Sequence, residues 1–334
     1  MLTDINTTMK KTRLDFFNLF LLLLAVGITI LYLASKVKNR EYEKVFWSGK
    51  ITVSASKQNL EHDSAIKVIE AKYYNTFDKS KRMLHSDSRV LLNSKSNDSI
   101  YFKSEHGLLP DSLHLKYFSI EDRKFYELNT NIPYNKIKKA AKASYGRLSI
   151  DVEIKSKGNV ILSVNSKNLI PEKTSVFQAQ ETTGNLSELL FVTRQKTRYN
   201  DYDGITNVKD FADLMGNKYN WVFKTELEPG DQISSAYAYS FLNEKIYDIE
   251  EDQILGKLSI PERFYIYWTN GNKYDTVYYF NPIEIFSTFR KLNHIDGEEP
   301  ILLTFKLYKD KYAECVLSKN GISIPVRNVH PKIP

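Results

Sequence analysis

Two stretches of the sequence share one pattern, and this pattern decides the fold that we expect. Leu109–Tyr117 reads LPDSLHLKY, and Ile260–Trp268 reads IPERFYIYW. After each proline, large apolar residues recur at every second position, which is the period of a strand with one buried face. The pattern therefore predicts two strands in equivalent places of the fold. The recurring residues are Leu113, Leu115 and Tyr117 in one strand and Phe264, Ile266 and Trp268 in the other.

The residues around the two stretches repeat as well. A tryptophan, Trp47 or Trp221, opens each copy, and each strand leads through a polar turn to a second aromatic strand. Pro133 or Pro282 then opens a short helix, and alternating strands close the copy. We therefore predict an α+β, β-rich fold with two tandem antiparallel sheet units, each with a short capping helix. Chance similarity between two ordinary hairpins is the alternative explanation.

The predicted boundaries divide the chain into five segments. They are a short N-terminal tail (1–15), a transmembrane helix (16–35), a first β-rich unit (45–180), a linker with a short helix (181–216) and a second β-rich unit (217–334). The transmembrane segment reads FFNLFLLLLAVGITILYLAS and carries no charge. A helix of this length rises about 30 Å, enough to cross the hydrocarbon core. The residues expected to anchor it in lipid are Phe16, Leu22, Leu24, Ile28, Ile30 and Leu33.

A cleavable signal peptide is the rival interpretation of this segment, because basic residues precede it. The apolar run is longer than the roughly 7–15 residues of a signal h-region and ends in a poor cleavage site, so we favour an uncleaved anchor. Basic residues are nearly balanced on its two sides, with Lys10, Lys11 and Arg13 before it and Lys36, Lys38, Arg40 and Lys44 after it. We expect a single pass through the inner (cytoplasmic) membrane, with the C-terminal body on the periplasmic side.

Composition and motifs argue against catalysis. The net charge of +7 is spread thinly, and no basic stripe with interleaved aromatics accompanies the lysines of 136–142, so we expect no nucleic-acid partner. The six histidines are dispersed without a metal-binding motif, and Asp201–Gly204 lacks the later ligands of a calcium loop. The only cysteine, Cys315, is expected in the core. We therefore predict no catalytic residue, no metal and no cofactor.

Tyr265 and Tyr267 are the candidate binding residues. They alternate out of phase with Ile266 and Trp268, so they should face outward from their strand. Exposed tyrosines often make binding surfaces, since they offer a large contact area at low conformational cost. The alternative is that a helix or the other unit covers these two tyrosines.

The first unit carries a series of short motifs. They are Leu109–Pro110 in the first strand, Ser119 with Lys124–Tyr126 in the hairpin, Ile132–Pro133 before the helix, and Phe177–Ala179 after the closing strands. With these motifs the chain resembles a bacterial envelope family known as domain of unknown function twenty-nine thirty-one. The likeness covers Trp47–Glu181 and, more faintly, Trp221–Ile324. It implies an envelope protein, although the lipidated cysteine of the family's lipoproteins is absent here.

The resemblance also bears on function, because some family members are encoded beside secreted phospholipase toxins of type VI secretion systems. This implies an immunity or inhibitory role for those members. We therefore expect a membrane-anchored envelope protein that binds a partner protein without catalysis. The alternative is a structural or accessory subunit of an envelope membrane assembly, and an enzyme acting on lipid or glycan is a third class.

Overall fold

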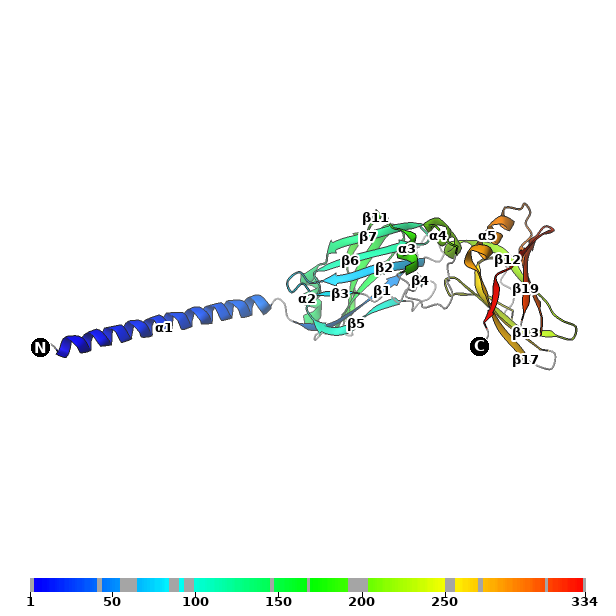
Figure 1. Cartoon of the computed structure of the whole chain (residues 1–334). Helices are drawn as coiled ribbons and strands as arrows, with labels where there is room; N and C mark the ends of the chain where they lie inside the picture. Colours follow the sequence, from blue (N-terminus) through cyan, green and yellow to red (C-terminus); the bar gives the residue numbers. More distant parts are fainter. Residues whose placement is uncertain are drawn as a thin grey trace.

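The computed structural model describes residues 3–40, 44–54, 65–83, 90–92, 99–144, 147–166, 169–191, 204–249, 256–269, 273–309 and 312–332. One long helix, α1 (Thr3–Arg40), precedes a β-rich body that contains four sheets (Figure 1). The predicted tail 1–15 is therefore helical from Thr3 onward, and α1 also continues beyond the apolar segment. No proline or glycine interrupts 3–15, so nothing in the sequence ends the helix at the edge of the apolar run.

The first half of the body, which we call the first unit, contains two sheets. Their strand orders are β10-β9-β8-β1-β5 and β11-β7-β6-β2-β3, and β4 also pairs with β2. The bounds are β1 Val45–Val53, β2 Ala65–Tyr74, β3 Lys81–Met83, β4 Val90–Leu92, β5 Ser99–Gly107, β6 Ser112–Ser119, β7 Lys124–Asn131, α2 Tyr134–Ala143, β8 Arg147–Ile154, β9 Asn159–Ser166, β10 Leu169–Gln178 and β11 Gln180–Thr182, with a 3-10 turn at Ser156–Gly158.

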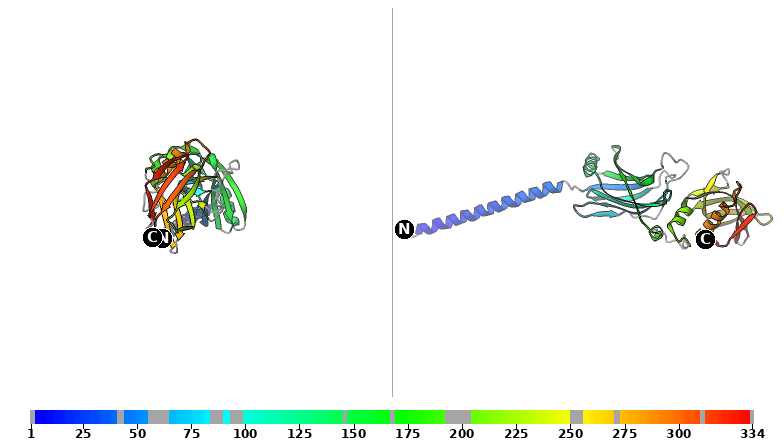
Figure 2. Two further views of the ribbon diagram at one scale, coloured as in Figure 1. Left: turned by 90° about the vertical axis from the view of Figure 1, so that its right-hand side faces the viewer. Right: turned by 90° about the horizontal axis from the view of Figure 1, so that it is seen from above.

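The second half, the second unit, also contains two sheets, and helices α3 (Leu186–Phe191) and α4 (Val208–Gly216) precede it. The strand orders are β15-β12-β18-β19-β20 and β14-β13-β16-β17-β21. The bounds are β12 Lys218–Glu226, β13 Gln232–Ser240, β14 Lys245–Asp248, β15 Lys257–Ser259, β16 Pro261–Thr269, β17 Lys273–Phe280, α5 Pro282–Asn293, β18 Ile301–Leu307, β19 Ala313–Lys319, β20 Ile322–Val326 and β21 Val329–Lys332. The two units lie in a row beyond α1 (Figures 1 and 2).

The sheets are not all antiparallel, which corrects the prediction of antiparallel sheet units. In the first unit β1 runs parallel to β8, with Trp47 opposite Leu148. In the second unit β12 runs parallel to β18, with Trp221 opposite Ile301. A parallel pair needs a long crossover connection. In each unit the chain between the paired strands supplies it by building most of the other sheet and one helix.

The core of each unit lies between its two sheets. In the first unit the ring of Trp47 meets that of Tyr73 at 5.5 Å, and the Tyr73 hydroxyl donates to the Ile150 carbonyl at 3.0 Å. In the second unit the ring of Phe223 stacks on Phe264 at 4.8 Å. These contacts join strands of opposite sheets, so burial of large side chains holds the layers together.

Helix α5 buries one apolar stripe. The Asn281 side chain accepts a hydrogen bond from the Glu284 amide and Pro282 occupies the first turn, two features that favour a helix start. The helix approaches β18, β19 and β20. Its fully buried stripe consists of Ile285, Phe286, Phe289 and Leu292.

The tryptophans that open the two units make the same contact. Trp47 Nε1 donates to the Leu108 carbonyl at 2.9 Å, and Trp221 Nε1 donates to the Ser259 carbonyl at 3.1 Å. Each acceptor lies two positions before the proline that begins the next strand segment. Both indoles are almost fully buried. The hydrogen bond therefore satisfies an indole N–H group that would otherwise be costly to bury.

The apolar core of the second unit extends to the neighbouring end of the first unit, which also has a core cluster of its own. Phe118 of β6 lies 6.3 Å from Phe211 of α4, measured between ring centroids, and both belong to the cluster that forms the core of the second unit. Arg123 Nη2 also lies 2.6 Å from an Asp213 carboxylate oxygen and 3.3 Å from Asn217 Oδ1. The predicted linker therefore includes a helix that packs against the first unit.

Candidate functional site

The outer face of the sheet β14-β13-β16-β17-β21 carries a group of tyrosines. Phe264, Ile266 and Trp268 of β16 are buried, while Tyr265 and Tyr267 lie on the opposite face and are partly buried. Three further tyrosines occupy the same face on β13 and β17. We call this group the tyrosine surface, and its members are Tyr237, Tyr239, Tyr265, Tyr267 and Tyr279.

Four of these rings pack against one another. Tyr237 stacks on Tyr265 with ring centroids 4.7 Å apart, and Tyr239 meets Tyr265 edge-on at 5.8 Å. The hydroxyl oxygens of Tyr237 and Tyr267 are 3.3 Å apart, within hydrogen-bond distance. Mutual packing accounts for the partial burial of the rings and holds them in a fixed arrangement.

Cations lie over two of the rings. The Arg263 guanidinium is centred 4.8 Å from the Tyr239 ring, and Lys245 Nζ lies 5.4 Å from the Tyr237 ring. Burial, followed by the hydrogen bond with Tyr267, raises the pKa of Tyr237 above its ordinary value. Tyr237 therefore keeps its hydroxyl proton to a higher pH than an isolated tyrosine does.

The sequence indicated only part of this surface. The structure brings Tyr265 and Tyr267 together with Tyr237 and Tyr239, which lie on a neighbouring strand. A signal for the second pair was present, since Ala236–Tyr239 reads AYAY and its small residues alternate with tyrosines. What the sequence does not state is that β13 pairs with β16, so that the two pairs become one surface.

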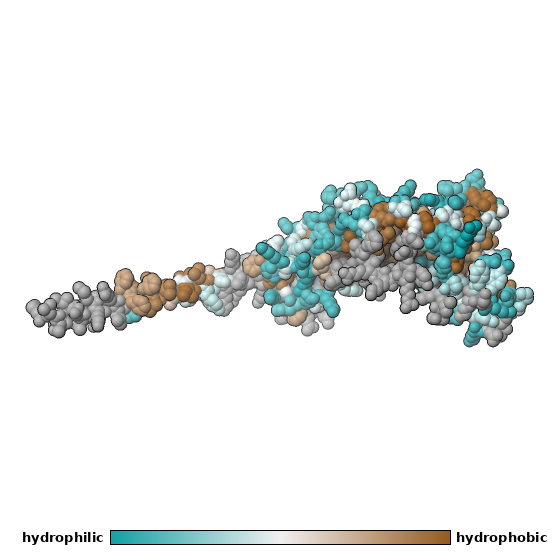
Figure 3. Space-filling view, in the orientation of Figure 1, coloured by the Kyte–Doolittle hydropathy of each residue, from teal (hydrophilic) through white to brown (hydrophobic). Residues whose placement is uncertain are grey.

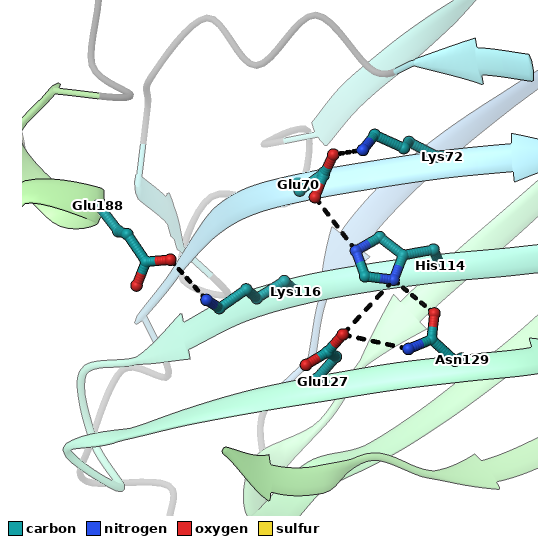
Figure 4. Close-up of polar contacts among 7 residues, drawn as sticks. All are labelled: Glu70, Lys72, His114, Lys116, Glu127, Asn129 and Glu188. Atoms are coloured by element: carbon teal, nitrogen blue, oxygen red, sulfur yellow. Dashed lines mark hydrogen bonds and ion pairs between the residues drawn. The ribbon is translucent and has the colours of Figure 1, made fainter. Parts of the chain in front are cut away.

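The outer face of the corresponding sheet in the first unit is charged (Figure 4). His114 of β6 lies at its centre, with Nε2 3.2 Å from Glu70 Oε2 and Nδ1 2.5 Å from Asn129 Oδ1. Glu127 is 3.7 Å from the same Nδ1 and accepts a hydrogen bond from Asn129 Nδ2 at 3.1 Å. Lys72 pairs with Glu70. Sequence reasoning missed this cluster, because its members come from three strands.

A second ion pair lies beside this cluster. Lys116 Nζ donates to Glu188 Oε1 at 2.5 Å, and Glu188 belongs to helix α3 (Figure 4). Partial burial acts to raise the pKa of Glu188, but the hydrogen bonds from Lys116 and from the Asn185 amide outweigh it and hold this pKa below its ordinary value. The charges of this face are thus paired with one another, which favours a structural role.

The two outer faces match position by position. In β2 the pairing with β6 shifts at a bulge between Val68 and Glu70, and in β13 the pairing with β16 shifts between Ile233 and Ser235. At the same distance after the bulge, the first unit has the cross-strand pair Lys72 and His114, and the second unit has the pair Tyr237 and Tyr265. The further matches are Lys116 with Tyr267, Glu127 with Asp275, Asn129 with Val277 and Asn131 with Tyr279.

Lys67 is the one lysine of the first unit's sheets that is almost fully buried among the described residues, with 1% of its surface exposed. It lies on β2 opposite Phe118. Burial lowers its pKa to about 8. The position that matches it in the second unit is Gln232, which is exposed.

The other residues considered in the sequence do not form a site. Among the residues that the structure describes, no three His, Cys, Asp or Glu side chains are placed to hold a metal ion. Residues 201–203 of the calcium-like motif lie outside the described residues. Cys315 is buried, and this burial raises the pKa of its thiol, so the thiolate that would react is disfavoured.

The apolar part of α1 is exposed along its length. Phe16–Ser35 is long and apolar enough to cross a membrane, with a mean hydropathy of 2.5, and none of it is buried against the body (Figure 3). At the predicted anchor positions between half and three quarters of each side chain is exposed, which fits contact with lipid. These positions are Phe16, Leu22, Leu24, Ile28, Ile30 and Leu33.

Comparison of the chain with protein-family models, with curated proteins and with solved structures finds no match. The candidate site therefore rests on the geometry of the two sheets.

Proposed function

We propose that the chain is a single-pass, membrane-anchored envelope protein whose tyrosine surface binds a partner protein without catalysis. The packed rings of Tyr237, Tyr239, Tyr265 and Tyr267 are the observation that carries this proposal. Tyrosine and arginine are enriched at the centres of protein interfaces. Rings already fixed against one another lose little conformational freedom on binding, so such a surface favours association.

The proposed anchorage rests on α1. Its uncharged 20-residue segment satisfies its own backbone hydrogen bonds and exposes apolar side chains on all sides, as a lipid-spanning helix requires. Within this proposal the membrane is the inner membrane and the body lies on its periplasmic side. The order of a short basic segment followed by the apolar run supports this orientation, because it resembles a signal anchor.

We further propose that the two units arose by tandem duplication. The equivalent indole hydrogen bonds, the equivalent parallel strand pairs and the bulges at matching positions of β2 and β13 support this origin. The resemblance of the first unit to domain of unknown function twenty-nine thirty-one belongs to the same proposal. If it is right, a secreted toxin is the first partner to examine.

Partner capture with the full chain tests the binding proposal. The tagged chain is expressed in its own host, cross-linked in living cells and purified, and the captured proteins are compared between variants. Tyr265→Ser combined with Tyr267→Ser should weaken a specific association at least about ten-fold, as loss of central interface tyrosines does. The matched control is His114→Ser with Lys116→Ser, at the corresponding positions of the first unit.

Equal capture by both variants would contradict the binding role of the tyrosine surface. Replacement of 16–35 by an unrelated apolar sequence tests the alternative that the chain is an accessory subunit of a membrane assembly. Loss of association in that variant alone would identify an accessory subunit that docks through its membrane helix. Circular dichroism and thermal unfolding of each purified variant establish that the body remains folded.

A further inference from the structure

The end of the first unit that faces α1 is built from four segments. Val45 at the start of β1 pairs with Gly107, and Ile132 before α2 donates its amide to the Asp111 carbonyl before β6. The turn after β2 is tied to the same end, because the Asn75 side chain donates to the Leu109 carbonyl at 2.6 Å. Helix α2 and the turn between β2 and β3 therefore lie where the chain enters the body from α1 (Figures 1 and 2).

Helix α2 is strongly basic. Ile137 and Ala141 bury one side of it, and its sequence YNKIKKAAKA contains four lysines and no acidic residue. Lys136, Lys139 and Lys142 are exposed, and Lys138 is partly buried. A helix whose only charges are lysines carries a positive potential, which favours contact with a negatively charged partner.

The turn between β2 and β3 adds an exposed aromatic ring and two more cations. Phe77 exposes 45% of its surface, and Lys79 and Lys81 beside it are exposed. Two acidic residues at this end are engaged in hydrogen bonds: Asp78 of the turn accepts one from the Ser80 amide, and Asp111, just before β6, accepts two from Thr76. An exposed phenylalanine flanked by lysines is typical of segments that lie in the interfacial layer of a membrane.

The length of α1 brings this end to the height of the lipid headgroups. Beyond Ser35 the helix continues over Lys36–Arg40, which adds about 7 Å. The headgroup layer on each side of a bilayer is about 5–8 Å thick. Only three residues separate Arg40 from Lys44, so the body begins immediately outside that layer.

We propose that this basic end docks on the anionic lipid headgroups of the bilayer that holds α1. It is made by Lys136, Lys138, Lys139 and Lys142 of α2, with Phe77 and Lys79 of the turn and Lys81 at the start of β3. The inference rests on the proposed anchorage. A lysine near an anionic surface typically improves attraction about five-fold, so three of them change the ratio of docked to undocked protein about a hundred-fold. Docking sets the body against the membrane and leaves the tyrosine surface free.

Fluorescence energy transfer in vesicles tests this proposal with the full chain. Asn135→Cys places a labelling site on the exposed side of α2, and the native Cys315 is buried and does not compete for the dye. The donor dye is attached there, and the acceptor is a lipid dye. Transfer should be higher in vesicles of phosphatidylcholine with 30% phosphatidylglycerol than in phosphatidylcholine alone, and it should fall in about 0.5 M salt, where charges are screened within a few ångströms.

Charge-reversal variants decide which residues are responsible. Lys136→Glu, Lys139→Glu and Lys142→Glu together should abolish the effect of phosphatidylglycerol, whereas the same three positions changed to Arg should retain it. The matched control changes three exposed lysines of the distal second unit, Lys257, Lys273 and Lys306, to Glu and should leave the response unchanged.

Two outcomes separate the failure of this proposal from that of the anchorage. In the first, the chain stays in the vesicles after an alkaline carbonate wash, while energy transfer is the same with and without phosphatidylglycerol. That result overturns the docking proposal and leaves the proposed anchorage intact. If the wash releases the chain, the anchorage itself fails. Tight binding of duplex DNA without any response to lipid would assign the lysines to nucleic acid and would also overturn the proposal.

Discussion

The outer faces of the two units use one framework for opposite surface chemistry. In the first unit the central positions hold Lys72, His114 and Lys116, and these side chains form ion pairs or hydrogen bonds within the face. In the second unit the matching positions hold Tyr237, Tyr265 and Tyr267, which stack on one another. The pairing of the strands is the same in both.

The difference shows which part of each sheet is constrained by folding. The inward positions of β6 and β16 hold large apolar residues in both units, because the space between the sheets must be filled. The outward positions are free of that demand, and most of them hold different residue types in the two units, although Glu127 and Asp275 are both acidic. A charged face whose members are paired offers little to a partner, whereas fixed aromatic rings offer contact area. This contrast is the reason for assigning the binding role to the second unit.

The largest expected effect tests whether the framework is equivalent in the two units. Trp47→Ala and Trp221→Ala should each lower the free energy of unfolding by about 3–5 kcal/mol, since each removes a buried ring that fills the space between sheets. Hydrogen exchange of the full chain in detergent micelles measures the cost separately for β1 and β12. Trp47→Phe and Trp221→Phe, which mainly remove the indole hydrogen bond, should cost about 1–3 kcal/mol. Costs that differ by more than about 2 kcal/mol between the units would break the equivalence.

The next effect concerns Lys67 and its exposed counterpart Gln232. The pKa of Lys67 is lowered from 10.5 to about 8, so between these pH values the unfolded chain holds a proton that the folded chain does not. The free energy of unfolding should therefore rise with pH from about 8 to 10.5. Below about pH 8 the buried ammonium group of Lys67 is charged and destabilises the folded chain. Lys67→Met should stabilise the chain by about 2–3 kcal/mol at pH 7. Urea unfolding of the full chain measures this.

Gln232→Met is the matched control, because the side chain at this position is exposed and its replacement buries nothing. It should change the free energy of unfolding by less than about 0.5 kcal/mol. A destabilising effect of Lys67→Met would mean that the ammonium group has a partner that stabilises it.

Exchange of the two faces sharpens the comparison further. His114→Tyr with Lys116→Tyr should cost about 1–2 kcal/mol, because Glu70, Glu127 and Glu188 lose the groups that face them. The reverse exchange, Tyr265→His with Tyr267→Lys, should cost a similar amount through loss of ring packing. Thermal unfolding at pH 7 measures both variants against the unchanged chain.

The smallest effect is confined to alkaline pH. The pKa of Tyr237 is raised, so the stability that its neutral form contributes is present below pH 10 and is lost as the pH rises above 10. Tyr237→Phe should therefore show a smaller drop in its urea midpoint between pH 10 and pH 11 than the unchanged chain. Tyr101→Phe, at an exposed position, serves as control. Identical pH profiles for the unchanged chain and Tyr237→Phe would show that the ring cluster does not perturb this hydroxyl.

Local features of the fold could be predicted from the sequence because they have a local cause. The uncharged run from 16 to 35 predicts the apolar part of α1, alternation predicts the buried faces of β6 and β16, and proline positions predict the starts of α2 and α5. The phase of Tyr265 and Tyr267 follows from the same alternation.

The pairing of distant strands could not be predicted in this way. Nothing in the alternation of β1 indicates that it runs parallel to β8, about a hundred residues later, so the sheets were expected to be antiparallel. The contact of Phe118 with Phe211 was missed for the same reason. The charged cluster around His114 and the full tyrosine surface also depend on which strands become neighbours.

The apolar region around Phe118 and Phe211, reinforced by Arg123 and Asp213, resists swivelling of one unit against the other. Within the proposed anchorage, the tyrosine surface of the second unit is then held at a fixed distance from the lipid. A partner that is itself embedded in the bilayer would need a long extramembrane domain to reach the tyrosine surface. A freely diffusing partner would reach it without such a domain.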